Sequence, residues 1–168
     1  MAIVSSAAAG LRAASRATII QLRAPGLSTA SFEREANELV AAAAVPVVIS
    51  SRCDVALATA AAGVNLPESD ISVAEARTLL GRRIIGRSVH SIKSALRAES
   101  EGGDYVIFGP VWESTSHPDA TPAGLASLAR LVRSVRIPVL AIGGVTQERV
   151  AEILACGAAG YAAIRLFE

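Results

Sequence analysis

The sequence is poor in aromatic residues and in lysine. Its 168 residues include one Trp, two Tyr and three Phe, too few for the aromatic platforms on which nucleic-acid bases stack. Lys93 is the only lysine among 16 basic residues, and the arginines are spread along the chain rather than clustered. With a net charge of +1, this composition argues against a nucleic-acid-binding surface.

Long apolar runs and paired cysteines are also absent. No uncharged apolar stretch reaches the length of about 18 residues that a membrane span needs, so we expect none. Cys53 and Cys156 form no CxxC motif, which favours reduced thiols in a cytoplasmic protein. Segment 1–17 is rich in Ala, Ser and Arg, as transit peptides are, which leaves an organellar protein as the alternative.

What the sequence does contain is enough apolar material for one buried core. Hydrophobic residues make up 52% of the chain and charged residues 18%, a balance that excludes an intrinsically disordered protein. No linker divides the chain, so we expect a single domain over residues 1–168.

Short apolar runs alternate with helical patterns along the chain. The runs are β-branched and apolar at most positions, which is typical of parallel strands buried on both faces. Eight such strands with right-handed crossovers predict an α/β fold, the (β/α)8 TIM barrel, with an open doubly wound sheet as the alternative. Since a typical barrel takes about 250 residues, we expect a short first helix near 7–16 and no last helix. The expected strands are 2–5, 17–22, 45–50, 63–66, 83–88, 104–109, 137–143 and 160–164.

Some helix starts carry capping signals. Ser72 and Glu75 have the spacing of a capping box. Thr121, followed by a proline, and Thr146 are expected to cap two further helices. The expected helices are 31–44, 72–81, 91–101, 122–135 and 146–156.

Two consecutive glycines follow the seventh expected strand. Functional sites of parallel barrels form where strands end and the next helix begins. Gly143 and Gly144 would let a ligand approach the backbone closely, and the N-terminus of the following helix would attract an anion. We predict a phosphate site here, with residues 160–165, including Ile164 and Arg165, supplying its second half. The alternative is a tight turn that needs glycine for its shape alone.

Other strand ends carry polar side chains. Gln21 and Arg23 alternate with an apolar residue and so point the same way, and Arg23 suits a diphosphate or carboxylate, or else a salt bridge at the rim. Ser88 ends the fifth expected strand. His90 follows it, either as an acid–base group or to orient a loop. Asp70, after the fourth strand, either binds a metal or caps a turn.

The longest expected loop, 109–121, carries several hydroxyl side chains. Long loops in compact domains are often functional, and hydroxyl and backbone N–H groups can hold phosphate. Ser114 and Ser116 are therefore candidate ligand contacts. His117 is the best-placed acid–base candidate, and its alternative is an exposed loop histidine.

Six motifs occur in order between residues 21 and 145, and together they resemble the thiamine phosphate synthase/TenI family, with a similarity that extends from about residue 17 to 167. This resemblance implies a TIM barrel that binds a thiazole phosphate. Synthases join that compound to a hydroxymethylpyrimidine diphosphate with Mg2+, whereas TenI relatives aromatise it by proton transfer or have no clear activity. The motifs are QLR (21–23), R-x-DVALA (52–58), GVNL (63–66), IGRSVHS (85–91), DYVIFGPVWESTSHPDA (104–120) and IPVLAIGGV (137–145).

The resemblance assigns roles to the residues that match the synthase pattern. Gln21, Arg23, Asp70 and Ser88 match positions that handle the pyrimidine diphosphate and the metal. The two glycines at 143–144 match the thiazole phosphate site. Other positions of this chain differ from the synthase pattern. The pattern has lysines where this chain has Pro25 and His117, and an Asn-Asp pair where it has Ser50 and Ser51. It has His, Gln and Ser where this chain has Asn65, Glu68 and Arg165.

These losses favour a TenI-like protein over a working synthase. Departure of a diphosphate develops negative charge that cations must stabilise, and two lysines and a carboxylate are missing. We therefore expect a protein that binds a thiazole phosphate, with His117 as the acid–base group and Ser88 and Arg23 beside it. The histidine that TenI tautomerases carry after the sixth strand is Pro110 here.

Two alternatives remain open at this point. One is a thiamine phosphate synthase with an altered site and Mg2+ as cofactor. The other is a non-catalytic domain that binds a phosphorylated ligand or a partner. Because a barrel without its last helix exposes apolar surface, we also expect a homo-oligomer.

Overall fold

The computed structural model describes residues 1–114 and 119–168 and has the predicted TIM-barrel architecture. The strands pair in parallel in chain order, from β1 to β8. All eight expected strands are present, most of them shorter than expected: β1 Ala2–Val4, β2 Ile20–Leu22, β3 Val47–Ser50, β4 Gly63–Leu66, β5 Ile84–Val89, β6 Tyr105–Phe108, β7 Val139–Ala141 and β8 Gly160–Tyr161.

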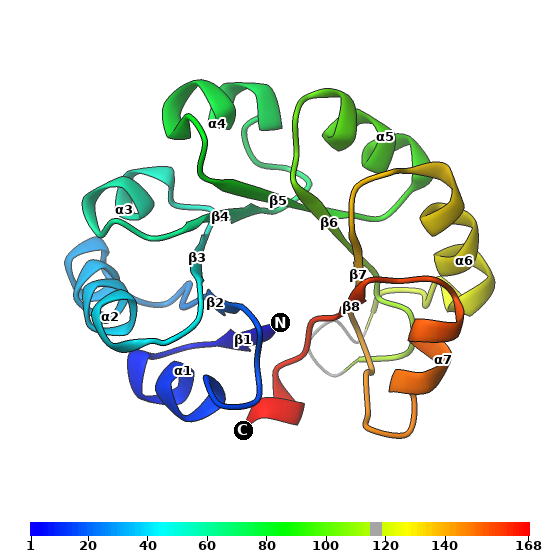
Figure 1. Ribbon diagram of the computed structural model, residues 1–168, viewed down its shortest axis with the longest axis horizontal. Helices are drawn as coiled ribbons and strands as arrows, with labels where there is room; N and C mark the ends of the chain where they lie inside the picture. The colour runs from blue at the N-terminus through cyan, green and yellow to red at the C-terminus, as the bar shows by residue number, and fades with distance from the viewer. Residues whose placement is uncertain (115–118) are drawn as a thin grey trace.

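The first and last parts of the sheet meet and close it into a barrel. Ala2 pairs in parallel with Ala163 just after β8. The Ile3 N–H donates to the Ala163 carbonyl at 2.9 Å, and the Ala163 N–H donates to the Met1 carbonyl at 3.1 Å. Figure 1 shows the resulting ring of strands, with the helices outside it. The open doubly wound alternative is therefore wrong.

The helices form the outer layer of the barrel. A one-turn 3-10 helix, η1 (Arg165–Phe167), follows β8, and no α-helix follows it in the described residues. None of the helices in the described part of the chain has the length and apolar character needed to cross a bilayer. The α-helices are α1 Ala7–Ala13, α2 Thr29–Ala42, α3 Cys53–Ala58, α4 Val73–Leu80, α5 Ile92–Ser100, α6 Gly124–Ser134 and α7 Val150–Ala155.

The capping prediction at Ser72 is confirmed, and two others are wrong. Ser72 and Glu75 form a complete capping box at the start of α4. Thr121 does not cap α6, because the Ala123 and Gly124 N–H groups pair with carbonyls of the loop after β6. Thr146 does not cap α7, because hydrogen-bonded turns over 146–150 delay the helix to Val150.

Successive side chains along each strand point to opposite faces of the sheet, and this produces two apolar cores. Ala2 and Val4 belong to the larger core between sheet and helices, whereas Ile3, between them, lies in the smaller core inside the barrel. Gly86 makes room inside the barrel for the Tyr105 ring, because a Cβ at Gly86 would lie 2.0 Å from that ring. The inner positions near the carboxyl ends of the strands are therefore the ones that face the barrel mouth.

Candidate functional site

A cavity of about 1150 Å³ opens at the carboxyl ends of the strands. Its wall contains apolar side chains of the inner core, including Ile3, Ile107 and Ile142, and polar groups from most strand ends. This combination of an apolar surface with a few convergent polar groups is typical of a small-molecule site. The cavity lies where functional sites of TIM barrels form.

The cavity brings together most of the residues that the sequence singles out. Asp70 does not line it, and Ser116 and His117 lie outside the described residues. His90, Asn65 and Glu68 are also part of the wall. The predicted residues that do line the cavity are Gln21, Arg23, Ser88, Ser114, Gly143, Gly144, Ile164 and Arg165.

Both glycines after β7 are required by the backbone. Gly143 and Gly144 have φ angles of +93° and +65°, which other residues rarely adopt. A Cβ on Gly143 would lie 2.5 Å from Pro110, and one on Gly144 would lie 2.6 Å from the Glu113 carbonyl oxygen. Within the described residues, no hydrogen bond uses the N–H of Gly143, Gly144 or Val145. The turn therefore leaves backbone donors available for an anion.

The expected helix terminus does not contribute to this turn. α7 has six residues and begins at Val150, well beyond the glycines. The available donors at 143–145 thus belong to an irregular segment. The loop after β6 holds that segment, because the Val111 and Trp112 N–H groups donate to the Ile142 and Gly143 carbonyls at 2.8 and 3.2 Å.

The buried polar side chains that β2 and β4 contribute to the cavity wall are uncharged. Gln21 and Asn65 are 3% and 2% exposed, and the Asn65 amide donates to the Ser88 hydroxyl at 3.1 Å. In the described part of the chain, the Gln21 Oε1 and Asn65 Oδ1 atoms have no hydrogen-bond partner. Buried polar atoms are normally paired, so these acceptors are suited to a ligand that donates hydrogen bonds. Arg23 lies beside them, exposed at the cavity rim.

His90 orients the loop after β6. Its Nδ1 lies 2.6 Å from the Gly109 carbonyl oxygen, which requires the ring to donate from Nδ1. Its Nε2 lies 3.7 Å from a Glu68 carboxylate oxygen across the cavity wall. The loop-orienting alternative considered for this histidine therefore has direct structural support.

Asp70, the predicted metal ligand, sits in a hydrogen-bonded corner. The Ser51 hydroxyl donates to its Oδ2, and the Ile71 N–H donates to its Oδ1 at 2.8 Å. No group of three or more His, Cys, Asp or Glu side chains with a metal-binding arrangement occurs among residues 1–114 and 119–168. One carboxylate with both oxygens engaged does not fit a divalent cation held by protein ligands alone.

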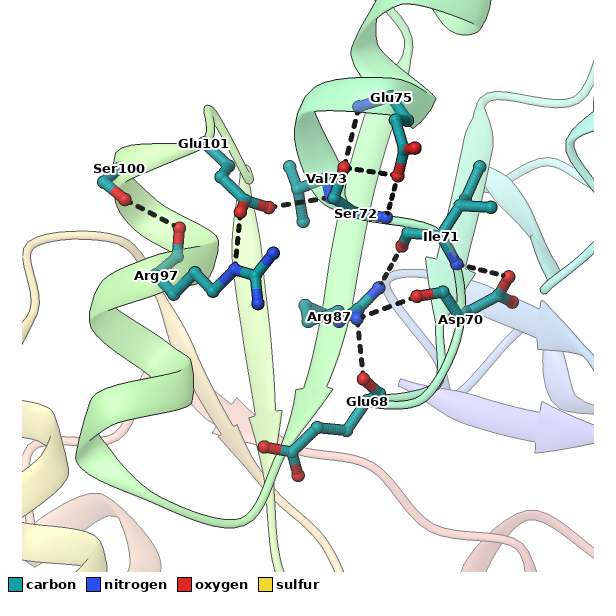
Figure 2. Close-up of polar contacts among 10 residues, drawn as sticks. All are labelled: Glu68, Asp70, Ile71, Ser72, Val73, Glu75, Arg87, Arg97, Ser100 and Glu101. Carbon is teal, nitrogen blue, oxygen red and sulfur yellow. Dashed lines mark hydrogen bonds and ion pairs between the residues drawn. The ribbon is translucent and has the colours of Figure 1, made fainter.

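Arg87 fixes the loop that carries Glu68 and Asp70. As Figure 2 shows, its guanidinium donates to three backbone carbonyls of that loop, those of Glu68, Asp70 and Ile71, at 2.7, 3.2 and 2.5 Å. Burial lowers the pKa of Arg87 from its usual value, and nearby carboxylates oppose this effect. The loop after β4 is thereby tied to strand β5.

Arg149 is a cavity residue that the sequence reasoning missed. It precedes α7, donates from Nη1 to the Gly144 carbonyl at 2.6 Å, and lies over the Trp112 ring at 4.8 Å from its centroid. The sequence analysis expected a helix over 146–156 and assigned Arg149 no role. The role of Arg149 becomes visible only because α7 begins at Val150 rather than at residue 146.

Comparisons with known proteins agree with the fold and the motifs. A family model described as thiamine monophosphate synthase matches residues 2–167. The thiamine-phosphate synthase of Chloroflexus aurantiacus is 40% identical over 152 residues, which cover 88% of this chain and 70% of that protein. The thiamine-phosphate synthase of Methanoculleus marisnigri is 40% identical over 161 residues, covering 93% and 76%.

Solved structures also resemble this chain, one of them in fold and sequence and the other in fold alone. The thiamine phosphate pyrophosphorylase from Pyrococcus furiosus superposes with a TM-score of 0.87 at 34% identity, over 94% of this chain and 78% of that one. FabK from Thermotoga maritima, as its M276A mutant, superposes with a TM-score of 0.81 at 18% identity, over 96% and 57%. This second likeness concerns the fold alone.

Proposed function

Because the chain belongs to the thiamine monophosphate synthase family, we propose that it is a thiamine-phosphate synthase, which joins a thiazole phosphate to a hydroxymethylpyrimidine diphosphate. The altered residues favoured a TenI-like protein from sequence. The named relatives, at 40% identity over most of the chain, favour the synthase instead.

A single observation carries this proposal. The glycine turn after β7 and the neutral polar groups on β2, β4 and β5 line one continuous cavity of about 1150 Å³. That volume lies above the range of about 300–1,000 Å³ that is typical of pockets for one small ligand, so it suits two small substrates side by side. An enzyme that joins two molecules needs both reacting centres in one space.

The two halves of the cavity suit the two substrates. The N–H groups at Gly143 and Gly144 would bind the phosphate of the thiazole. Gln21 and Asn65 offer buried acceptors to a ring that carries hydrogen-bond donors, such as an aminopyrimidine. Arg23 would contact the diphosphate, because a guanidinium binds such oxygens with two parallel hydrogen bonds.

The reaction needs positive charge where the diphosphate leaves. A bond forms between the thiazole nitrogen and the pyrimidine methylene carbon, and the carbon–oxygen bond to the diphosphate breaks, with its electron pair leaving on oxygen. Arg23 can stabilise that developing charge. Mg2+ is the cofactor that the resemblance implies. The side chains around Asp70 do not provide enough ligands to hold this ion without a substrate.

An assay with both substrates and Mg2+ tests the proposal. We expect formation of thiamine phosphate, followed by chromatography, at a rate that falls at least about tenfold in Gln21→Ala and Arg23→Gln. Arg133→Gln, a change of the same charge on the exposed face of α6, is the matched control. No product above background with the intact chain would overturn the synthase proposal.

A TenI-like thiazole tautomerase is the second candidate. It is favoured by the lone carboxylate at Asp70, paired with Ser51 where the resemblance places a second carboxylate. His117 would supply the acid–base group. Conversion of the thiazole phosphate to its aromatic isomer, followed by NMR in deuterated water, tests this candidate. Isomerisation without condensation would establish it, and tight binding with neither reaction would favour the non-catalytic alternative.

A further inference from the structure

Arg149 places a positive charge directly beside the glycine turn. It comes from the segment between β7 and α7, and its side chain turns back to line the cavity. Its Nη1 atom would lie only 3.3 Å from a Cβ built on Gly144. The guanidinium is thus in contact with the same residue whose N–H is available for an anion.

Two contacts fix the orientation of this guanidinium. Nη1 donates to the Gly144 carbonyl at 2.6 Å, and the Cζ atom lies over the Trp112 ring at 4.8 Å from its centroid. A cation held over an aromatic face gains stabilising electrostatic energy and keeps its N–H edges in a fixed direction. Because one N–H serves Gly144, the remaining N–H groups are available to a second acceptor.

The charge on Arg149 interacts with the adjacent Glu148 but forms no ion pair with it. Ion pairs hold Arg52, Arg77 and Arg97, whereas Arg149 is in no ion pair with any described residue. Glu113 lines the same cavity, and Glu148 is the adjacent residue in sequence, but neither is within ion-pair distance. A guanidinium in a cavity wall without an ion-pair partner is suited to bind an anionic ligand.

We propose that Arg149 binds the phosphate group held at the Gly143–Gly144 turn. This assignment rests on the proposed function for the identity of the ligand, a phosphorylated thiazole. The guanidinium approaches the phosphate from the side of α7 while the backbone N–H groups approach from the turn. Its contact with the Trp112 ring joins the described start of the segment after β6 to the same phosphate.

Titration calorimetry with three ligands tests the role of Arg149. The ligands are inorganic phosphate, the phosphorylated thiazole and the same thiazole as its free alcohol, each titrated into wild type and Arg149→Gln. We expect both phosphate-bearing ligands to bind at least about tenfold more weakly to the variant, since a charge-assisted hydrogen bond is lost. Affinity for the free alcohol should not change.

Arg133→Gln is the matched control for the loss of charge, because Arg133 is exposed on α6 and outside the cavity. It should bind all three ligands like wild type. If Arg149→Gln bound the phosphate-bearing ligands as tightly as Arg133→Gln does, the assignment would be wrong. A merely structural role would weaken binding of the free alcohol as well, and that result would also overturn it.

A second variant keeps the test decisive if Arg149→Gln does not fold. Arg149→Lys preserves the charge but loses the planar fork and the ring contact, so we expect phosphate affinity at least about threefold weaker. Unchanged affinity in this variant would contradict the proposal. Binding of inorganic phosphate that depends on Arg149, without binding of the phosphorylated thiazole, would support Arg149 and reject the proposed function.

Discussion

At the scale of single residues, Gly144 is one of the cavity positions that do not tolerate a side chain. Its φ is +65°, and a Cβ would lie 2.6 Å from the Glu113 carbonyl and 2.7 Å from Trp112. We expect Gly144→Ala to lower the free energy of unfolding by about 2 kcal/mol, because a left-handed backbone alone costs an L-residue roughly 1–2 kcal/mol. Urea denaturation measures this loss, and phosphate titration should show weaker binding.

Gly26→Ala is the control for this substitution. Apart from Gly26 and its two chain neighbours, no residue among 1–114 and 119–168 has an atom within 4 Å of a Cβ built on Gly26, and Gly26 is not in the cavity wall. The stability of this variant should differ from wild type by less than about 0.5 kcal/mol. Equal stability of the Gly26 and Gly144 variants would show that the turn tolerates a side chain.

Ser51 is hydrogen-bonded to Asp70 at the position where the resemblance places a second carboxylate. Its hydroxyl occupies one oxygen of Asp70, and its φ is +68°, a conformation that Asp adopts more readily than most residues. We expect Ser51→Asp to create a two-carboxylate site that binds Mn2+ at least about tenfold more tightly than wild type. Electron paramagnetic resonance of free Mn2+ measures this change without any assay of activity.

Ser50→Asp is the matched comparison, since Ser50 lines the cavity one residue earlier and makes no contact with Asp70 in the described structure. Tight Mn2+ binding by wild type, lost in Asp70→Asn, would contradict the expectation and support the metal role predicted for Asp70.

Some site residues could be predicted from sequence because their residue type or their place in a strand indicates one structural role. Consecutive glycines at a strand end indicate an approach to the backbone, and Gln21 and Ser88 face the cavity because side chains alternate along a strand. Arg149 was not predictable in the same way. Its place depends on the turns over 146–150 that delay the start of α7, and on contacts of its side chain with Gly144 and Trp112.

At the scale of elements, Glu101 joins α5 to the first turn of α4. Its carboxylate accepts from the Val73 N–H at 3.0 Å and from the Arg97 Nε at 2.6 Å, as Figure 2 shows. The hydrogen bond from Arg97, followed by the Val73 N–H, holds the pKa of Glu101 below its usual value, and burial opposes this effect. The ionised carboxylate therefore stabilises the junction between the two helices.

The sign of the pH effect follows from this lowered pKa. A carboxyl whose pKa is lower in the folded state stabilises the fold above its unfolded pKa of about 4.3. The contribution is lost as the pH falls through the folded value. We expect Glu101→Gln to cost about 1 kcal/mol at pH 7 and progressively less below about pH 4. Thermal unfolding of wild type and variant across that range measures the difference.

Glu38→Gln is the control, since Glu38 is exposed on α2 and takes part in no hydrogen bond with described residues. Its effect should be small and independent of pH. A Glu101→Gln penalty that stays constant down to pH 3 would show that shape, rather than charge, stabilises the junction.

Elements were predictable where the determining contacts are local. The box formed by Ser72 and Glu75 starts α4 because both partners lie within one turn of chain. The starts of α6 and α7 were wrong, because residues before them pair with the loop after β6 or with each other. Capping residues such as Thr121 and Thr146 signal a helix only when no such competing contact exists.

At the scale of the whole molecule, barrel closure converts eight separate strand ends into one cavity. The alternation of apolar runs predicted the barrel, because strands buried on both faces require helices around them. The shape of the cavity was not predictable, since it depends on which inner side chains meet across the barrel. Exposed apolar side chains remain on the outer helices, among them Leu57, Leu79 and Leu154. The homo-oligomer stays a prediction that light scattering can test.

Because one cavity spans the barrel mouth, a ligand bound there contacts strands from both halves of the barrel and should stabilise the whole fold. A ligand at 100 times its Kd adds about 2.7 kcal/mol. For a domain of this size that corresponds to about 5–10 °C in Tm. We expect the phosphorylated thiazole to produce such a shift, with unfolding still a single transition. Scanning calorimetry measures both.

The Gly144→Ala variant separates the two halves of the cavity in the same experiment. It should lose most of the shift caused by the phosphorylated thiazole and keep the shift caused by the pyrimidine diphosphate, because Gln21 and Arg23 are on the far wall. Loss of both shifts would mean that the two ligands compete for the glycine turn. In that case the cavity would hold one substrate at a time, which is incompatible with an enzyme that joins two.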